Sequence, residues 1–258
     1  MQGEGIKLND RRRSILALLS RDGKVQVAQL SALLGASEVT IRSDLTEMEK
    51  EGLLERVHGG AMPARRSYLS MNMQQRRAEN VEQKMRIAAA AAERIREGET
   101  LMVNAGTTAL FTAMELKKLR NIKVVTNSIP IAMELSGCPG IQLIALGGHI
   151  DPQHAFTYGD DALNQLRRYK ADRLILSVDG VDAEGGLSTY HYEASELNRL
   201  MIERARAVAV TADYTKIGYE SFSHIAPSEA CDVLITDGGA SRSQLDALAA
   251  RGIEVVVV

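Results

Sequence analysis

Residues 25–45 read VQVAQLSALLGASEVTIRSDL, and Gly35 divides this stretch into two halves. Apolar residues recur at helical spacing in each half, which predicts one helix over 27–34 and another over 38–51, joined by a tight turn at Gly35. Ser37 is a good N-cap for the second helix. The residues expected to face the core are Leu30, Leu33 and Leu34 in the first helix and Val39, Ile41, Leu45 and Met48 in the second.

The flanking residues extend this pattern on both sides. Before it, Asn9 or Asp10 can cap a helix that stops near Gly23. After it, residues 53–57 can form a strand, and residues 58–60, which read HGG, can form a tight turn. The order helix, helix, turn, helix, wing predicts a winged helix-turn-helix DNA-binding domain over residues 1–62.

The second helix of such a motif enters the major groove and presents its N-terminal residues to the base edges. Arg42 can bind guanine or a phosphate, and Thr40 and Ser43 can bond to either. Residues of the wing would touch the backbone or the minor groove. The candidate DNA-binding residues are Ser37, Glu38, Thr40, Arg42, Ser43, Arg56 and His58. The alternative is a small three-helix module for protein contact.

Length and composition fit a globular protein of one or two domains. The chain has 258 residues, of which 45% are hydrophobic and 25% are charged. No apolar run approaches the roughly 18 residues that span a bilayer, and the polar N-terminus lacks the apolar core of a signal peptide. Two cysteines, Cys138 and Cys231, exclude a disulfide scaffold and a cysteine-rich zinc site. We therefore expect a cytoplasmic protein without membrane contact.

Charge is distributed unevenly along the chain. Residues 1–96 contain 17 Lys and Arg against 12 Asp and Glu, whereas residues 97–258 contain 14 against 21. A basic part joined to an acidic part indicates that the first binds a polyanion and that the second has another task. A solvated basic face is the alternative interpretation.

The remainder of the chain alternates short apolar strands with helices. Residues 63–80, with Pro63 and two arginine pairs, are expected to be a linker, and an alanine-rich helix over 80–97 leads into a second domain over 81–258. Strands are expected at 100–104, 122–127, 141–146, 172–178, 206–211, 232–236 and 253–258, and helices near 107–120, 129–136, 160–170, 191–205 and 241–251. Strands that are apolar throughout predict an open, mostly parallel α/β sheet, with a ligand site at the carboxyl ends of its strands.

A strand-to-helix turn at residues 104–108, which read NAGTT, has the features of a phosphate site. Backbone N–H groups at a helix N-terminus can bind phosphate, and small residues permit close approach. The alternative is an ordinary turn with a threonine cap. The next two strands also end in small or polar residues, TNS at 126–128 and GG at 147–148, and Lys216 follows the fifth strand.

With these motifs in order, the chain resembles DeoR-family bacterial transcriptional regulators over nearly its whole length. The resemblance implies an N-terminal DNA-binding domain and a sugar-phosphate-binding effector domain, and residues 158–199 look most like the amino-sugar and sugar-alcohol members. The matching segments are VQVAQLSALLGAS (25–37), VTIRSDL (39–45), ERVHGGA (55–61), NAGTT (104–108), TNS (126–128), LGG (146–148), DGVD (179–182), GGLSTYHYEASELNR (185–199), DYTKIG (213–218) and ITD (235–237).

Two positions depart from the family pattern. The family usually has a second arginine where Ser43 stands, so one DNA contact differs, and it usually has aspartate where Asn104 stands, which removes a charge from the expected ligand pocket. The resemblance and the strand ends together define the candidate effector site. Its residues are Asn104, Gly106, Thr107, Thr108, Thr126, Asn127, Ser128, Gly147, Gly148, Asp179, Gly180, Asp182, Glu193 and Lys216.

The carboxylates of this set also resemble the active-site segment of ribose-5-phosphate isomerases, whose fold the DeoR effector domain is thought to share. Asp179, Asp182 and Glu193 could supply acid and base groups for an aldose–ketose isomerisation. However, Glu184 stands where those enzymes usually carry a lysine before the glycine pair. We therefore expect no catalytic residues.

The five histidines show no metal-ligand spacing. His149 and His154 with Asp151 could in principle ligate a metal, but a solvated loop is the favoured interpretation. No nucleotide-binding phosphate loop occurs in the sequence. Neither a metal nor a cofactor is therefore expected.

The sequence as a whole predicts a repressor of sugar-catabolism genes that binds double-stranded operator DNA and responds to a phosphorylated sugar. A single winged domain makes too few base contacts, so a homo-dimer or tetramer is expected. The alternatives are a sugar-phosphate isomerase with an accessory domain and a scaffolding module that binds no ligand.

Overall fold

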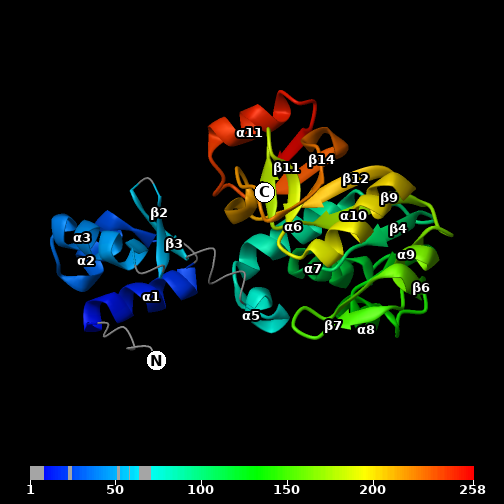
Figure 1. The fold of residues 1–258 in the computed structure, drawn as a ribbon, viewed down its shortest axis with the longest axis horizontal. Coiled ribbons are helices and arrows are strands. Elements are labelled where there is room, and N and C mark those ends of the chain that lie inside the picture. Colours follow the sequence, from blue (N-terminus) through cyan, green and yellow to red (C-terminus); the bar gives the residue numbers. More distant parts are fainter. Residues whose placement is uncertain (1–8, 23–24, 51–52, 58, 64–70) are drawn as a thin grey trace. The chain divides into compact units, whose positions relative to one another are not determined.

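The computed structural model in Figure 1 describes residues 9–22, 25–50, 53–57, 59–63 and 71–258. Contacts divide the chain into two compact units, Met1–Asn80 and Val81–Val258. His58 and residues 64–70 of the expected linker lie outside the described residues. Each unit is described by itself below.

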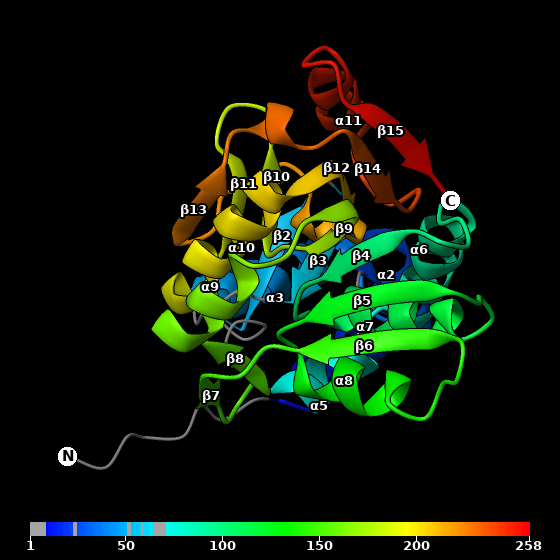
Figure 2. The same cartoon turned by 90° about the vertical axis from the view of Figure 1, so that its right-hand side faces the viewer.

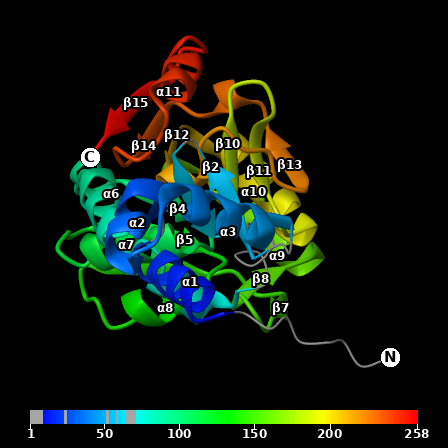
Figure 3. The ribbon, with the colours of Figure 1, turned by 90° about the vertical axis from the view of Figure 1, so that its left-hand side faces the viewer.

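The described part of the N-terminal unit is a winged helix-turn-helix, as the sequence predicts (Figure 3). Its elements are α1 (Asp10–Asp22), β1 (Val25–Gln26), α2 (Val27–Leu34), α3 (Glu38–Lys50), β2 (Leu54–Val57) and β3 (Gly60–Pro63). The three strands form an antiparallel sheet in the order β1-β3-β2. Gly35 ends α2 with φ 62°, a left-handed conformation that glycine adopts without a Cβ clash.

The core of this unit differs from the expected one at two apolar residues. Leu33 is 59% exposed and Val39 is 75% exposed, so the expectation that both face inward is wrong. Val39 precedes the buried Ile41 by two residues, which places it about 200° away around α3. Leu33 follows Leu30 by three residues but is not among the buried residues of α2, which are Val27 and Leu30. The buried apolar side chains are Ile15, Leu19, Val25, Val27, Leu30, Ile41, Leu45, Met48, Leu54 and Ala61.

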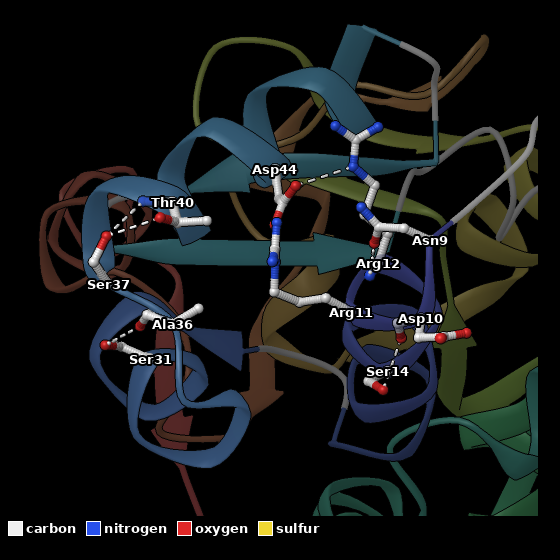
Figure 4. A network of polar contacts seen from close by, with 10 residues as sticks. All are labelled: Asn9, Asp10, Arg11, Arg12, Ser14, Ser31, Ala36, Ser37, Thr40 and Asp44. Carbon is white, nitrogen blue, oxygen red and sulfur yellow. Dashed lines mark hydrogen bonds and ion pairs between the residues drawn. The ribbon is translucent and has the colours of Figure 1, made fainter.

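A buried carboxylate joins α3 to α1 (Figure 4). Asp44 lies on the core face of α3, where its Oδ2 accepts a hydrogen bond from Arg11 Nε at 2.5 Å and its Oδ1 accepts one from Arg12 Nε at 3.1 Å. Burial raises the pKa of Asp44, but the bonds from the two arginines outweigh it and hold that pKa below its ordinary value. The Asp44 charge therefore fixes the position of α3 against α1.

Asp44→Asn is expected to lower the free energy of unfolding of this unit by about 1–3 kcal/mol near neutral pH, because two charge-assisted bonds become neutral ones. Because the pKa of Asp44 is lowered in the folded protein, its contribution to the free energy of unfolding is complete at pH values above the ordinary aspartate pKa of about 3.9. This contribution is lost as the pH falls through the pKa of Asp44 in the folded protein. Calorimetry of the full chain should show the difference from wild type shrinking on acidification. Glu47→Gln, which removes an exposed pair with Lys50, is the matched control and should have little effect. A pH-independent difference would contradict this role.

The C-terminal unit is built on a seven-stranded sheet in which every neighbouring pair is parallel (Figure 2). In order across the sheet, the strands are β15 (Glu254–Val257), β14 (Val233–Thr236), β12 (Ala205–Thr211), β9 (Ala171–Ser177), β4 (Thr100–Val103), β5 (Ile122–Thr126) and β6 (Ile141–Ala145). This parallel pairing confirms the predicted α/β architecture. Each of the seven strands also overlaps one of the apolar runs expected to form a strand.

Helices cover both faces of this sheet, which explains why its strands are apolar on both sides. The helices are α6 (Val81–Glu93), α7 (Thr107–Leu116), α8 (Ile129–Leu135), α9 (Asp160–Leu166), α10 (Tyr192–Arg204) and α11 (Arg242–Ala249). Ile235 packs with α6, whereas its neighbour Leu234 packs in the cluster that contains α9, α10 and α11 residues. The side chains of successive residues in β14 therefore pack on opposite faces of the sheet.

Several short elements were not expected from the sequence. Two antiparallel ribbons occur, one of β10 (Gly180–Asp182), β11 (Gly186–Thr189) and β13 (Ser223–Ala226) and one of β7 (His149–Asp151) and β8 (Phe156–Tyr158). Single-turn helices η1 (Tyr214–Lys216) and η2 (Ser228–Ala230) follow β12 and β13. The expected linker at 63–80 contains the helix α5 (Met73–Ala78), which begins at a capping box between Asn72 and Gln75. The segment expected to link the domains therefore contains a helix that the sequence analysis did not anticipate.

Candidate functional site

The first turns of α3 present a mixed polar and apolar surface. Ser37 caps the helix, because its Oγ accepts a hydrogen bond from the Thr40 N–H at 3.2 Å (Figure 4). Arg42 is exposed and pairs with Glu38 at 2.7 Å, a contact between two solvated side chains that DNA can replace. Ser43 is exposed beside it. The structure thus brings these five predicted DNA-binding residues together, and Val39 joins them as an exposed apolar side chain that the sequence interpretation placed in the core.

Arg56, the predicted wing residue, lies against α3. Its Nη1 donates to Thr46 Oγ1 at 3.0 Å, and its backbone N–H donates to Glu49 Oε1 at 2.8 Å. These bonds attach β2 to the side of α3, so Arg56 adds a positive charge beside that helix.

The carboxyl edge of the parallel sheet holds the other candidate site. β4 lies beside β9 in the middle of the sheet, and the chain leaves these two strands toward opposite sides of the strand order, as at the switch point where open α/β sheets bind ligands. Asn104 directly follows β4. Its Nδ2 donates to Ser177 O at 2.9 Å and to Asn198 Oδ1 at 3.1 Å, and its Oδ1 accepts from the Ser177 N–H at 2.7 Å. The amide therefore bridges β4, β9 and α10.

The turn after Asn104 is packed tightly against β9. A Cβ added to Gly106 would lie 2.3 Å from Ser177 Cβ, closer than two carbon atoms can approach. Ser177 Oγ also accepts a hydrogen bond from the Ala109 N–H at 2.9 Å, which anchors the first turn of α7. Thr107 and Thr108 are the first two residues of that helix, and both are buried. The helix N-terminus therefore lies directly over the strand ends.

The residues at the ends of β5 and β6 organise the adjoining loops. Asn127 Oδ1 accepts from the Ala105 N–H at 3.0 Å and its Nδ2 donates to Thr157 O at 3.1 Å. Thr126 Oγ1 accepts from the Ser128 N–H, and Ser128 caps α8. A cavity of about 400 Å³ opens beside them. Its lining residues are Thr126, Asn127, Ser128, Ile129, Ala132, Met133, Ser136, Leu143, Ala145, Leu146 and Thr157.

The glycine pair after β6 is held by close contacts. The Gly147 N–H donates to Gln165 Oε1 at 3.1 Å. Gly148 has φ 140°, and a Cβ there would lie 2.5 Å from Tyr158 O. These two residues let β6 pass directly into the β7–β8 hairpin.

The predicted carboxylates do not form one cluster of acids and bases. Asp179 follows β9, and its Oδ2 accepts from the Thr189 hydroxyl and the Tyr190 N–H, each at 3.0 Å. Asp182 lies at the far end of β10, where its Oδ1 accepts two backbone N–H bonds that close the hairpin. Gly180 permits a close approach to Tyr219 O, which a Cβ would contact at 2.4 Å. Glu193 lies half-buried in the first turn of α10.

Lys84, Lys216 and Asp213 are buried near the carboxyl end of β12. Of these three, the candidate effector site predicted from the sequence included Lys216 but neither Lys84 nor Asp213. Lys84 on α6 is 1% exposed, and Lys216 is also buried. Burial raises the pKa of Asp213, but the charges of Lys216 and Lys84, together with bonds from Thr215, lower it below its ordinary value. Spacing could have found Lys84, because it shares the helical stripe of Ile87, Ala88 and Ala91.

Asp237, after β14, is a further buried acid at this edge. Burial raises its pKa, and the nearby Asp213 charge raises it further, while hydrogen bonds from the Tyr214 and Gly239 N–H groups oppose the shift.

In the described residues, no helix is both long enough and apolar enough to cross a membrane.

Two family models match the chain. The DeoR-like helix-turn-helix domain matches residues 11–66, and the DeoR C terminal sensor domain matches residues 79–238. The putative aga operon transcriptional repressor of Escherichia coli O157:H7 is 35% identical over 252 residues, which cover 97% of this chain and 94% of that protein. The glycerol-3-phosphate regulon repressor of Escherichia coli K12 is 29% identical over 251 residues, with coverage of 97% and 99%. Among solved structures, ribose 5-phosphate isomerase A of Methanocaldococcus jannaschii has a TM-score of 0.41 and 17% identity, over 54% of this chain and 55% of that one.

Proposed function

The chain belongs to the DeoR family of transcriptional regulators, and from that premise we propose that its C-terminal unit binds a phosphorylated sugar and thereby changes the affinity of its N-terminal unit for operator DNA. Relatives named as repressors of the aga operon and of the glycerol-3-phosphate regulon support a role as a repressor of sugar-catabolism genes. Family membership places the chain among regulators rather than enzymes. The resemblance to isomerases would place a lysine at position 184. This chain has Glu184 there, and its carboxylate pairs with Arg251 at 2.9 Å.

The observation that carries the sugar-phosphate proposal is the turn at Gly106. Phosphate binds where several backbone N–H groups at a helix N-terminus point toward one place and no side chain blocks the approach. Gly106 lets the N-terminus of α7 lie at the β4–β9 switch point, and Thr107 and Thr108 add hydroxyl donors there. A phosphate would occupy this end of α7, and the sugar hydroxyls would extend toward Asp179 and Glu193.

The buried positive charge of Lys84 and Lys216 supports the same assignment. β12 is two strands away from β4, a separation of about 10 Å at the usual strand spacing. The charges of both lysines lower the pKa of Asp213, which follows β12. A doubly charged phosphate at α7 would therefore enter a region in which the protein already holds cations.

The exposed face of α3 supports the proposed DNA contacts. Arg42 can donate two hydrogen bonds to guanine, and the exposed Val39 can pack on a thymine methyl group. Because one such helix reads only a few base pairs, we propose that a homo-dimer or tetramer binds repeated half-sites in double-stranded operator DNA. A cytoplasmic location, where sugar phosphates and the chromosome meet, fits this proposal.

A sugar phosphate that binds at α7 is expected to raise the melting temperature of the protein and to release it from operator DNA. Replacing Thr107 and Thr108 together with alanine should weaken ligand binding by about 10-fold or more, because hydrogen bonds to a charged group contribute about 1.5–3 kcal/mol each. A thermal-shift screen of sugar phosphates followed by operator titrations measures both effects. Thr112→Ala, on the same helix, is the control, because its hydroxyl bonds to Thr108 O within the helix. Loss of operator binding with unchanged ligand affinity would contradict the proposal.

A further inference from the structure

Three side chains outside the proposed sugar-phosphate site converge near the start of α10. Asp151 ends β7, His154 lies in the β7–β8 turn, and His191 is the N-cap residue of α10. One donor atom from each residue lies within 4.8 Å of the others. The rings of His154 and His191 are 4.1 Å apart between centroids. The expected solvated loop is wrong for His154, which is 7% exposed.

We propose that Asp151, His154 and His191 bind a divalent transition metal ion, with Zn²⁺ as the representative. Two imidazoles and a carboxylate are ligands that suit zinc and its neighbours rather than Mg²⁺ or Ca²⁺, which prefer oxygen donors. Ligands about 2.0–2.1 Å from a tetrahedral zinc ion are about 3.4 Å from one another. Asp151 Oδ1 and His154 Nδ1 are 3.1 Å apart, and the His191 donor lies within 4.8 Å of the other two, so it must move closer to bind the same ion.

The cluster is held in place by its own surroundings. Asp151 Oδ1 accepts backbone N–H bonds from Gln153 at 3.0 Å and from His154 at 2.6 Å, which orient the carboxylate. The Phe156 ring lies 6.5 Å from the His154 ring and 5.9 Å from the His191 ring, so it forms an apolar wall on one side. Three protein ligands leave a fourth position on zinc for water or another ligand.

A metal ion at this place would join two segments that are far apart in the sequence. The β7–β8 hairpin supplies two ligands, and the loop that leads into α10 supplies the third. Tyr190, which precedes His191, donates its backbone N–H to Asp179 Oδ2. The ion would therefore restrain the segment that holds Asp179, and this site does not depend on sugar-phosphate binding.

Calorimetric titration of metal-free full-length protein with ZnCl₂ tests the site. We expect one Zn²⁺ per chain, and at least about 10-fold weaker binding in Asp151→Asn, His154→Ala and His191→Ala, since losing even an outer partner of a metal ligand typically costs 10–100-fold. Asp151→Asn keeps an oxygen that can accept the two N–H bonds of the turn, so its fold should survive. His149→Ala is the matched control, because His149 is an exposed histidine on the same hairpin. MgCl₂ should give no comparable binding.

Co²⁺ supplies a second readout. Its visible absorption bands should appear with wild-type protein and His149→Ala and be lost in the three ligand variants. Absence of Zn²⁺ binding to the wild type would overturn the site and leave Asp151 and His154 as a structural hydrogen-bonded pair. Unchanged binding in all three variants, or equal weakening in His149→Ala, would also overturn it.

Discussion

Gly106→Val is expected to abolish the response of operator binding to sugar phosphate while operator binding itself persists. A Cβ at this position would lie 2.3 Å from Ser177 Cβ and 2.8 Å from Ser177 Oγ, so either the turn or β9 must move. Overpacking of this kind costs about 1–3 kcal/mol of stability. Any shift of the turn also displaces the N–H groups at the start of α7, which must converge on the phosphate.

A compensating variant separates this explanation from general damage. In Gly106→Ala combined with Ser177→Gly, the clashing Cβ and Oγ are removed, and ligand affinity should recover above that of Gly106→Ala alone. Recovery should be incomplete, because the Ser177 bond to the Ala109 N–H is also removed. Gly137→Ala is the control, since a Cβ there meets no atom within 4 Å. Calorimetric ligand titrations and operator titrations report the two activities. Wild-type ligand affinity in Gly106→Val would exclude the α7 site.

Arg42→Ala is expected to weaken binding to a specific operator by about 1–3 kcal/mol, or about 5- to 150-fold, if the guanidinium reads a guanine. The fold should tolerate the change, because Arg42 is exposed and its pair with Glu38 is solvated. Equilibrium titrations of wild type and variant against the operator and against single-base variants measure the effect. Discrimination should relax at one base pair per half-site.

Lys50→Ala provides the comparison for Arg42, because Lys50 ends α3 and pairs with the exposed Glu47. If Arg42 contacts a phosphate instead of a guanine, Arg42→Ala should weaken binding to all DNA sequences equally and reduce the salt dependence of binding. A folded Arg42→Ala protein that binds the operator like the wild type would remove Arg42 from the DNA-reading residues.

The sequence predicted the large elements well because their patterns are local. An apolar run bounded by polar residues suffices to place each parallel strand, and Gly35 and Ser37 mark the two ends of the tight turn. The ribbons β7–β8 and β10–β11–β13 were missed because strands of three or four residues show no reliable alternation. Val39 was misplaced because an apolar residue was taken as buried without its angle around the helix.

The candidate site could be predicted only in part. Parallel strands bring their carboxyl ends to one edge, which is why Asn104, Asn127 and Asp179 could be grouped from sequence. What each side chain bonds to could not be predicted, because the partners are distant along the chain. Asp182 illustrates this limit, since its place at a hairpin turn depends on strands that the sequence pattern did not reveal.

The amide of Asn104 has a consequence for the design of biosensors from this protein. An aspartate at this position would replace these N–H donors with an oxygen that faces Ser177 O and Asn198 Oδ1. Rotating the Asn198 amide would relieve one of these repulsions but not the other. A designer who wishes to change the charge of the pocket must therefore redesign residues 104 and 198 together with the β9 backbone near them, as one module.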